Sequence, residues 1–148
     1  MRDMAKYAAM RPYFELVAQS LRGLVEGTDF FDMHADDVVV EYIITVPDYP
    51  RRIVGREALA ELYADYGDSI VQSGSSDVYR YYDPEKSVVV LEYTLHGTVV
   101  STGAPYLNRF ISVITVKDRK IVQWRDYLDP LAVFAAFGNA PAPGAHTA

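Results

Sequence analysis

Four segments with the composition of β-strands follow one another between residues 77 and 129. They are DVYRYY (77–82), SVVVLEYTLHGTVV (87–100), PYLNRFISVITV (105–116) and KIVQWRDYLD (120–129). All are rich in the β-branched and aromatic residues that favour strands. The last two are separated by so few residues that a hairpin is the natural interpretation. This succession constrains the fold more than any other feature and predicts a curved antiparallel sheet.

Helical patterns lie before and after these strands. Apolar residues recur at helical spacing after Pro12, and Asp129 followed by Pro130 is a typical helix start. Pro47 and Pro50 exclude the segment between them from a central strand. The predicted order is a helix from Pro12 to Val25, a strand over 36–44, a helix over 56–70, the four strands, and a helix from Pro130 to Phe137 closed by Gly138. Such segregation predicts an α+β fold with helices packed on one face of the sheet.

Length and composition indicate one domain. The chain has 148 residues, half of them hydrophobic, which suffices for one sizeable core. Neither a repeat nor a linker divides it, so residues 1–138 are predicted to form a single domain. The segment NAPAPGAHTA, residues 139–148, is predicted to be a disordered tail.

Charge and residue usage argue against several classes of function. The net charge is −6 and the longest basic cluster is Arg51-Arg52, so we expect no nucleic-acid partner. The three histidines are scattered and there is no cysteine, so we expect neither a metal site nor another cofactor. No secretion signal pattern or apolar run of about 18 residues is found. We therefore expect no membrane association and a cytoplasmic location.

Asp126 is an isolated acid in an apolar strand face. Alternation over IVQWRDYL places Val122, Trp124, Asp126 and Leu128 on one face and Ile121 on the other. A buried carboxylate without a partner costs several kcal/mol or gives up its ionisation. A pocket acid whose pKa is raised by its apolar neighbours is one explanation. An aspartate bonded to a backbone group or a buried arginine is the other.

The hairpin places further side chains beside this acid. A three-residue loop, 117–119, would pair Phe110 with Asp126, whereas a two-residue loop would pair Ile111 with it, and periodicity leaves both registers open. In the first register an apolar wall with a few polar groups forms, the usual composition of a small-molecule pocket. Its members are Tyr106, Asn108, Phe110, Ser112, Trp124, Asp126 and Leu128, and Tyr93 on the neighbouring strand is expected to point inward.

The motifs KIVQWRDYLDP, ADDVVVEY and GREALAELY resemble those of SnoaL-like proteins in the nuclear transport factor 2 superfamily, which are related to ketosteroid isomerases and limonene epoxide hydrolases. The resemblance covers residues 10–138. It implies a cone-shaped α+β barrel, with a curved antiparallel sheet wrapped by helices around a deep cavity, and commonly a homodimer. Leu107, Ile111 and Val113 on the outer sheet face are consistent with a covering partner.

The resemblance also suggests roles for single residues. Asp126 matches the acid/base carboxylate of SnoaL-like polyketide cyclases, and the PhzA/PhzB proteins have an acid there too. Tyr42 falls at the base position of ketosteroid isomerases. The epoxide hydrolase set corresponds to Val40, Tyr42, Tyr93 and Leu95, so its Asp-Arg-Asp arrangement is absent and that reaction is the least favoured.

These observations lead to one main hypothesis and one alternative. In the first, a cofactor-independent enzyme binds an apolar, carbonyl-bearing molecule and catalyses isomerisation or aldol-type cyclisation. Asp126 moves protons while Tyr42, Tyr93 and Tyr106 donate hydrogen bonds to the carbonyl oxygen and Asn108 orients the ligand. In the alternative, the same cone is a non-catalytic binding or dimerisation module, and these polar groups bond within the core.

Overall fold

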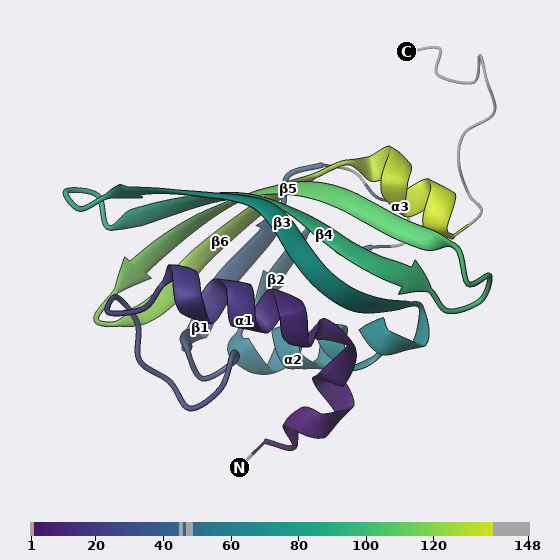
Figure 1. Ribbon diagram of the computed structural model, residues 1–148. Helices are drawn as coiled ribbons and strands as arrows, with labels where there is room; N and C mark the ends of the chain where they lie inside the picture. Colours follow the sequence, from purple (N-terminus) through teal and green to yellow (C-terminus); the bar gives the residue numbers. More distant parts are fainter. Residues whose placement is uncertain (1, 45, 47–48, 138–148) are drawn as a thin grey trace.

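The computed structural model describes residues 2–44, 46 and 49–137 (Figure 1). The predicted tail and Gly138 lie outside these residues. The elements in chain order are η1 (Met4–Met10), α1 (Arg11–Ser20), β1 (His34–Tyr42), β2 (Arg52–Val54), α2 (Arg56–Ala64), η2 (Tyr66–Asp68), β3 (Ile70–Asp83), β4 (Val88–Val99), β5 (Pro105–Lys117), β6 (Lys120–Leu128) and α3 (Pro130–Ala136).

The six strands form one curved, unclosed sheet in the order β2-β1-β6-β5-β4-β3. Helices α1 and α2 lie on the same face of this sheet, and α3 lies at its far end (Figure 1). The predicted α+β class and the helix layer are therefore confirmed. The expectation of a wholly antiparallel sheet is wrong in one place, because β1 and β6 pair in parallel. These strands are distant in the sequence, so no hairpin dictates their direction.

Several boundaries differ from the sequence prediction. Strand β3 begins at Ile70 rather than 77, and α2 ends at Ala64 rather than running to 70. Residues 72–76 are polar or glycine, which in sequence indicates a loop. They nevertheless pair with β4, with Gly74 opposite His96, since the long β4 offers them hydrogen-bonding partners. The short β2, which pairs with β1, follows the proline segment and was not predicted.

The β5–β6 hairpin has neither of the two expected registers at Asp126. Its turn is the two-residue loop of Asp118 and Arg119, with φ of 51° and 61°, as a type I′ turn requires. Val116 then faces Ile121, but Thr115 faces Gln123, so one extra residue is accommodated in β6. This bulge places Asp126 opposite Ser112. It also turns Ile121 into the core beside Trp124, contrary to strict alternation.

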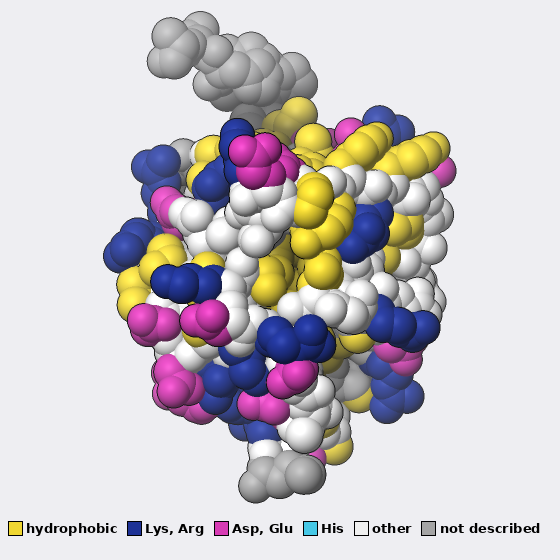
Figure 2. Space-filling view, turned by 90° about the vertical axis from the view of Figure 1, so that its left-hand side faces the viewer, with side chains coloured by type: hydrophobic (Ala, Val, Ile, Leu, Met, Phe, Trp, Pro, Cys, Tyr) yellow, Lys and Arg dark blue, Asp and Glu magenta, His cyan; other side chains and the backbone are white. Residues whose placement is uncertain are grey.

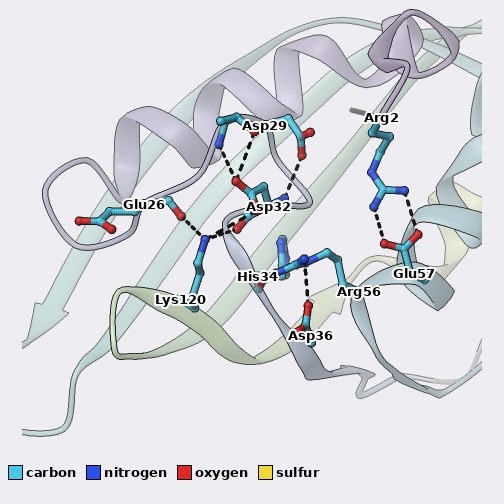
Figure 3. Close-up of polar contacts among 10 residues, drawn as sticks. Arg2, Glu26, Asp29, Asp32, His34, Asp36, Arg56, Glu57 and Lys120 are labelled. Atoms are coloured by element: carbon cyan, nitrogen blue, oxygen red, sulfur yellow. Dashed lines mark hydrogen bonds and ion pairs between the residues drawn. The ribbon is translucent and has the colours of Figure 1, made fainter.

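The core fills the space between the helices and the sheet, and charged side chains bond to backbone carbonyls at its edge. Lys120 ties the hairpin to the segment after α1, because its Nζ donates to the carbonyls of Glu26 at 2.9 Å and Asp32 at 2.6 Å (Figure 3). Arg56 Nη2 donates to the carbonyl of His34 at 2.7 Å (Figure 3). These contacts fix the start of β1, and hence the strand that carries Tyr42.

The surface carries both signs of charge. On the face of Figure 2, basic and acidic side chains are interspersed among apolar ones, so this face does not present the single-sign patch typical of nucleic-acid binding. Within the described residues, no helix is long and apolar enough to cross a membrane.

Candidate active site

A cavity of about 420 Å³ opens between the helices and the inner face of the sheet. That volume lies within the range of small-molecule sites. Its walls are mostly apolar and aromatic, with a few polar groups. The lining includes Tyr13, Tyr42, Tyr49, Tyr63, Asp65, Tyr66, Gln72, Tyr106, Phe110, Asp126, Leu128, Val133 and Phe137.

Asp126 is the buried acid of this cavity, and its two oxygens differ in their hydrogen bonds. The residue is 3% exposed. Its Oδ1 accepts hydrogen bonds from Ser112 Oγ at 2.6 Å and from Trp124 Nε1 at 2.5 Å. No described residue donates to Oδ2. Since the indole N–H can only donate, Oδ1 is held as an acceptor, and a proton on Asp126 belongs on Oδ2.

A chain of hydroxyls supports Oδ1 from behind. Tyr93 Oη lies 2.7 Å from Ser112 Oγ. Because Ser112 has a single proton and gives it to Asp126, Tyr93 must donate to Ser112. The chain therefore runs from Tyr93 through Ser112 to Asp126, with every donor directed toward the carboxylate. This arrangement stabilises the ionised acid.

Burial nevertheless dominates the acidity of Asp126. Desolvation raises the pKa of this carboxyl to about 6, while the hydrogen bonds from Ser112 and Trp124 oppose the rise. A carboxyl that titrates close to neutrality can both accept and return a proton. The acid that interrupts the apolar face of β6 thus lines the cavity and forms no ion pair with the described residues.

Two tyrosines form a second polar group in the cavity. Tyr42 lies beside Asp126 in the parallel register of β1 and β6, and its Oη is 3.2 Å from that of Tyr63 on α2. Desolvation raises the pKa of both hydroxyls well above the usual value, so both keep their protons. One hydroxyl donates to the other, which leaves the proton of the receiving hydroxyl available to a ligand.

The residues predicted from the sequence fall into two layers. Tyr42, Tyr106, Phe110, Asp126 and Leu128 line the cavity. The remaining four, Tyr93, Asn108, Ser112 and Trp124, are buried behind this lining.

Asn108 bonds to protein groups through both ends of its amide. Its Nδ2 donates to Tyr106 Oη at 2.9 Å, and its Oδ1 accepts from the backbone N–H of Asp129 at 3.0 Å. It thus joins a lining tyrosine to the residue that begins α3.

Sequence reasoning missed the side of the cavity that the helices supply. Tyr13 comes from α1 and Tyr63 from α2. Gln72 in β3 is held by two bonds: its Oε1 accepts from the backbone N–H of Tyr13 and its Nε2 donates to Tyr66 Oη. In the sequence, Tyr63 and Tyr66 lie at helical spacing from Leu59 and Leu62 within the helix predicted over 56–70, which was the available indication.

Metal ligands are not clustered in the part of the chain that the structure describes. There, no group of three or more His, Asp or Glu side chains lies close enough together to hold a metal ion.

The architecture defines a class of protein. An unclosed curved sheet, covered by helices around a cavity with a buried acid, is the cone fold of nuclear transport factor 2-like proteins. More specifically, the chain belongs to the SnoaL-like family, whose domain matches residues 11–124.

Individual relatives agree with this assignment. The uncharacterised protein YesE of Bacillus subtilis strain 168 is 34% identical over 133 residues, which covers 86% of this chain and 90% of YesE. A PhzA/B-like protein of Pseudomonas aeruginosa is 25% identical over 130 residues, covering 86% of this chain and 92% of that protein. A Bacillus subtilis crystal structure, provisionally described as an isomerase, superposes with a TM-score of 0.72 at 27% identity, covering 94% and 98% of the two chains.

Proposed function

We propose that this protein is a cofactor-independent acid/base enzyme that acts on an apolar, carbonyl-bearing small molecule. The observation that carries the proposal is that Asp126 lines a cavity with two donors on Oδ1 and none on Oδ2 among the described residues. In its ionised form, Oδ2 accepts a proton from the carbon next to the carbonyl group of the ligand. Membership of a family that includes isomerase-type and cyclase-type proteins supports this reaction class.

The paired hydroxyls of Tyr42 and Tyr63 suit the other half of the reaction. As the proton leaves, negative charge develops on the carbonyl oxygen, and a preorganised donor stabilises it. The receiving hydroxyl of the pair has a free proton for that oxygen, and the first hydroxyl supports it at 3.2 Å. Tyr106 Oη, which accepts from Asn108, likewise keeps its own proton for a ligand.

Two outcomes are then open to the enolate. Return of the proton from Asp126 to a different carbon gives isomerisation. Attack of the enolate carbon on a second carbonyl group of the same molecule forms a carbon–carbon bond while the C=O π bond breaks. The resulting alkoxide takes up the proton that Asp126 holds, which completes an aldol cyclisation. In both cases Asp126 ends in the state in which it began, and no electrons are gained or lost by the protein.

Deuterium exchange tests the proton transfer without knowledge of the natural substrate. Enolisable aryl ketones are incubated with the protein in D₂O at pD 8, and loss of the α-proton signal is followed by NMR. We expect Asp126→Asn to lower the exchange rate by roughly 10²- to 10⁴-fold, the usual contribution of a general base. Asp65→Asn is the matched control, because Asp65 is an exposed carboxylate on the same cavity. Equal rates for wild type and Asp126→Asn would refute the proposal.

The main competing function is a binding module without chemistry. It uses the same cavity, so it predicts binding of aryl ketones that is measurable by calorimetry but no protein-dependent exchange of their α-protons. Calorimetry and exchange on the same ketone therefore separate the two functions.

We further propose that the protein is a homodimer through the outer face of the sheet. Leu107, Ile111 and Tyr127 are exposed there, Leu107 by 51%, and neighbouring exposed apolar side chains are typical of an interface. Light scattering after size exclusion checks this, with Leu107→Lys as the disrupting variant. A monomer at micromolar concentration would contradict the proposal.

A further inference from the structure

The charged groups of the cavity are all of one sign. Of the described residues that line it, Asp65 and Asp126 are acidic, and none is Lys, Arg or His. The protein as a whole has a net charge of −6. A cavity with one sign of charge and low-dielectric walls concentrates ligands of the opposite sign.

Tyrosine rings make up much of the remaining wall. Tyr13, Tyr42, Tyr49, Tyr63, Tyr66 and Tyr106 all line the cavity. Tyr42 and Tyr49 meet at 77° with their ring centroids 5.0 Å apart, which forms a corner next to the strand position of Asp126. A cation over the face of an aromatic ring is attracted by the ring quadrupole, and aromatic cages bind quaternary ammonium groups in this way.

We propose that the cavity binds an organic cation, a ligand whose carbonyl-bearing skeleton carries an ammonium or quaternary ammonium group beside Asp126. The inference deepens the proposed function, since it names the substrate class of the same site. None of the described residues donates a hydrogen bond to Oδ2. A cation next to this oxygen gives it an electrostatic partner instead. It also keeps Asp126 ionised, which is the form that accepts a proton from carbon.

The same features disfavour anionic ligands. A carboxylate or phosphate in the cavity would lie near Asp126, which is 97% buried, and would find no basic side chain among the described lining residues. An unpaired charge taken out of water is costly, and a like charge nearby adds to that cost. A neutral ketone avoids this penalty but lacks the attraction.

Three probes of similar shape test the sign of the preferred charge. They are 4-acetyl-N,N,N-trimethylanilinium, its neutral isostere 4-tert-butylacetophenone, and the anion 4-acetylbenzoate. Calorimetric titration of the full-length protein at pH 8 is expected to give the cation a Kd at least tenfold lower than the neutral isostere, with no binding of the anion. At pH 5, where Asp126 is mostly protonated, the preference for the cation is expected to fall several-fold. Equal affinities for cation and isostere at both pH values would overturn the inference, as would tightest binding of the anion.

Variants distinguish the contribution of the Asp126 carboxylate to cation binding from that of the tyrosine rings. Asp126→Asn is expected to remove most of the preference for the cation while binding of 4-tert-butylacetophenone persists. Tyr49→Leu is expected to weaken cation binding, whereas Tyr49→Phe, which keeps the ring, preserves it. Tyr49 is 37% exposed, so both changes are compatible with folding. If neither Asp126→Asn nor Tyr49→Leu alters the preference, the assigned site is wrong.

Binding and exchange together distinguish failure of the cation inference from failure of the proposed enzyme. Asp126-dependent α-proton exchange in 4-tert-butylacetophenone without charge preference would overturn only the cation inference. Charge preference without exchange in any probe would instead overturn the enzyme and retain the cation site.

Discussion

Asp126→Asn is expected to stabilise the folded protein at neutral pH. The asparagine side chain has the shape of the protonated acid, and its oxygen can still accept from Ser112 and Trp124. Its amide group then replaces Oδ2 at the cavity. In the wild type at pH 7, by contrast, a desolvated carboxylate must be held in the fold.

The size of the effect follows from the two pKa values of Asp126. Burial raises the pKa of Asp126 from 3.8 to about 6. Between these values the folded state binds more protons than the unfolded state, so the free energy of unfolding falls as pH rises. At 1.36 kcal/mol per pKa unit, the loss attributable to Asp126 is about 3 kcal/mol and is complete above pH 6. The difference between variant and wild type should therefore be near zero at pH 3.5 and about 3 kcal/mol at pH 7.

The comparison must be made between variants, because His34 titrates in the opposite sense. Desolvation lowers the pKa of His34 from 6.5 to about 4. Its contribution to stability is therefore present above pH 6.5 and is lost as pH falls toward 4. In the wild type, the contributions of Asp126 and His34 to the free energy of unfolding change with pH in opposite directions and largely cancel. In Asp126→Asn only the contribution of His34 remains.

Urea unfolding of both proteins at pH 3.5, 5, 6 and 7 measures the difference directly. Asp65→Asn serves as the control for loss of a carboxylate at the same cavity, since Asp65 is exposed. A difference that is constant across this range would refute the reasoning, as would lower stability of Asp126→Asn at pH 7. Either result would mean that Asp126 is solvated or paired in the folded state.

Three further predictions concern single contacts. Ser112→Ala removes a donor to Oδ1 and should raise the pKa of Asp126 by roughly one to two units, since a hydrogen bond to a charged group contributes about 1.5 to 3 kcal/mol. The pH profile of ketone exchange measures the shift. Gly97→Ala should lower the free energy of unfolding by roughly 1 to 3 kcal/mol in urea titrations, because its Cβ would lie 2.6 Å from the carbonyl oxygen of Val71. Asp129→Ala should lower the free energy of unfolding by about 1 kcal/mol in the same assay, because the Asp129 carboxylate accepts from the backbone N–H of Leu131 at 3.0 Å and caps α3. Asp129→Asn should lower it less.

Local patterns were sufficient for the fold class but not for strand pairing. The β4 and β5 segments could be recognised because their apolar runs are long, and α3 because Asp129 and Pro130 mark its start. The parallel pairing of β1 with β6 depends on contacts between distant residues, which periodicity does not contain. The bulge in β6 could not be predicted for a related reason, because it depends on how Thr115 and Val116 pair across the hairpin.

The acid of the site could be predicted, but most of its surroundings could not. Asp126 was recognisable because it interrupts an apolar strand face, which is a property of the sequence alone. The tyrosines that approach it come from α1, α2 and the segment before β2, and tyrosine at such positions is equally typical of a core. Their convergence on one cavity requires the folded arrangement of these elements.

The buried acid and the apolar wall have opposite effects on stability, and their combination indicates what the site is suited to do. A neutral side chain at position 126 would accept the hydrogen bonds of Ser112 and Trp124 equally well. It would also avoid the loss of about 3 kcal/mol in the free energy of unfolding at pH 7. The hydrogen bonds therefore do not account for a carboxylate at that position. What only a carboxylate adds is an anionic Oδ2 at the cavity surface, able to take up a proton or to attract a cation. We therefore propose that this oxygen acts on a bound ligand, since a purely structural role requires no charge there.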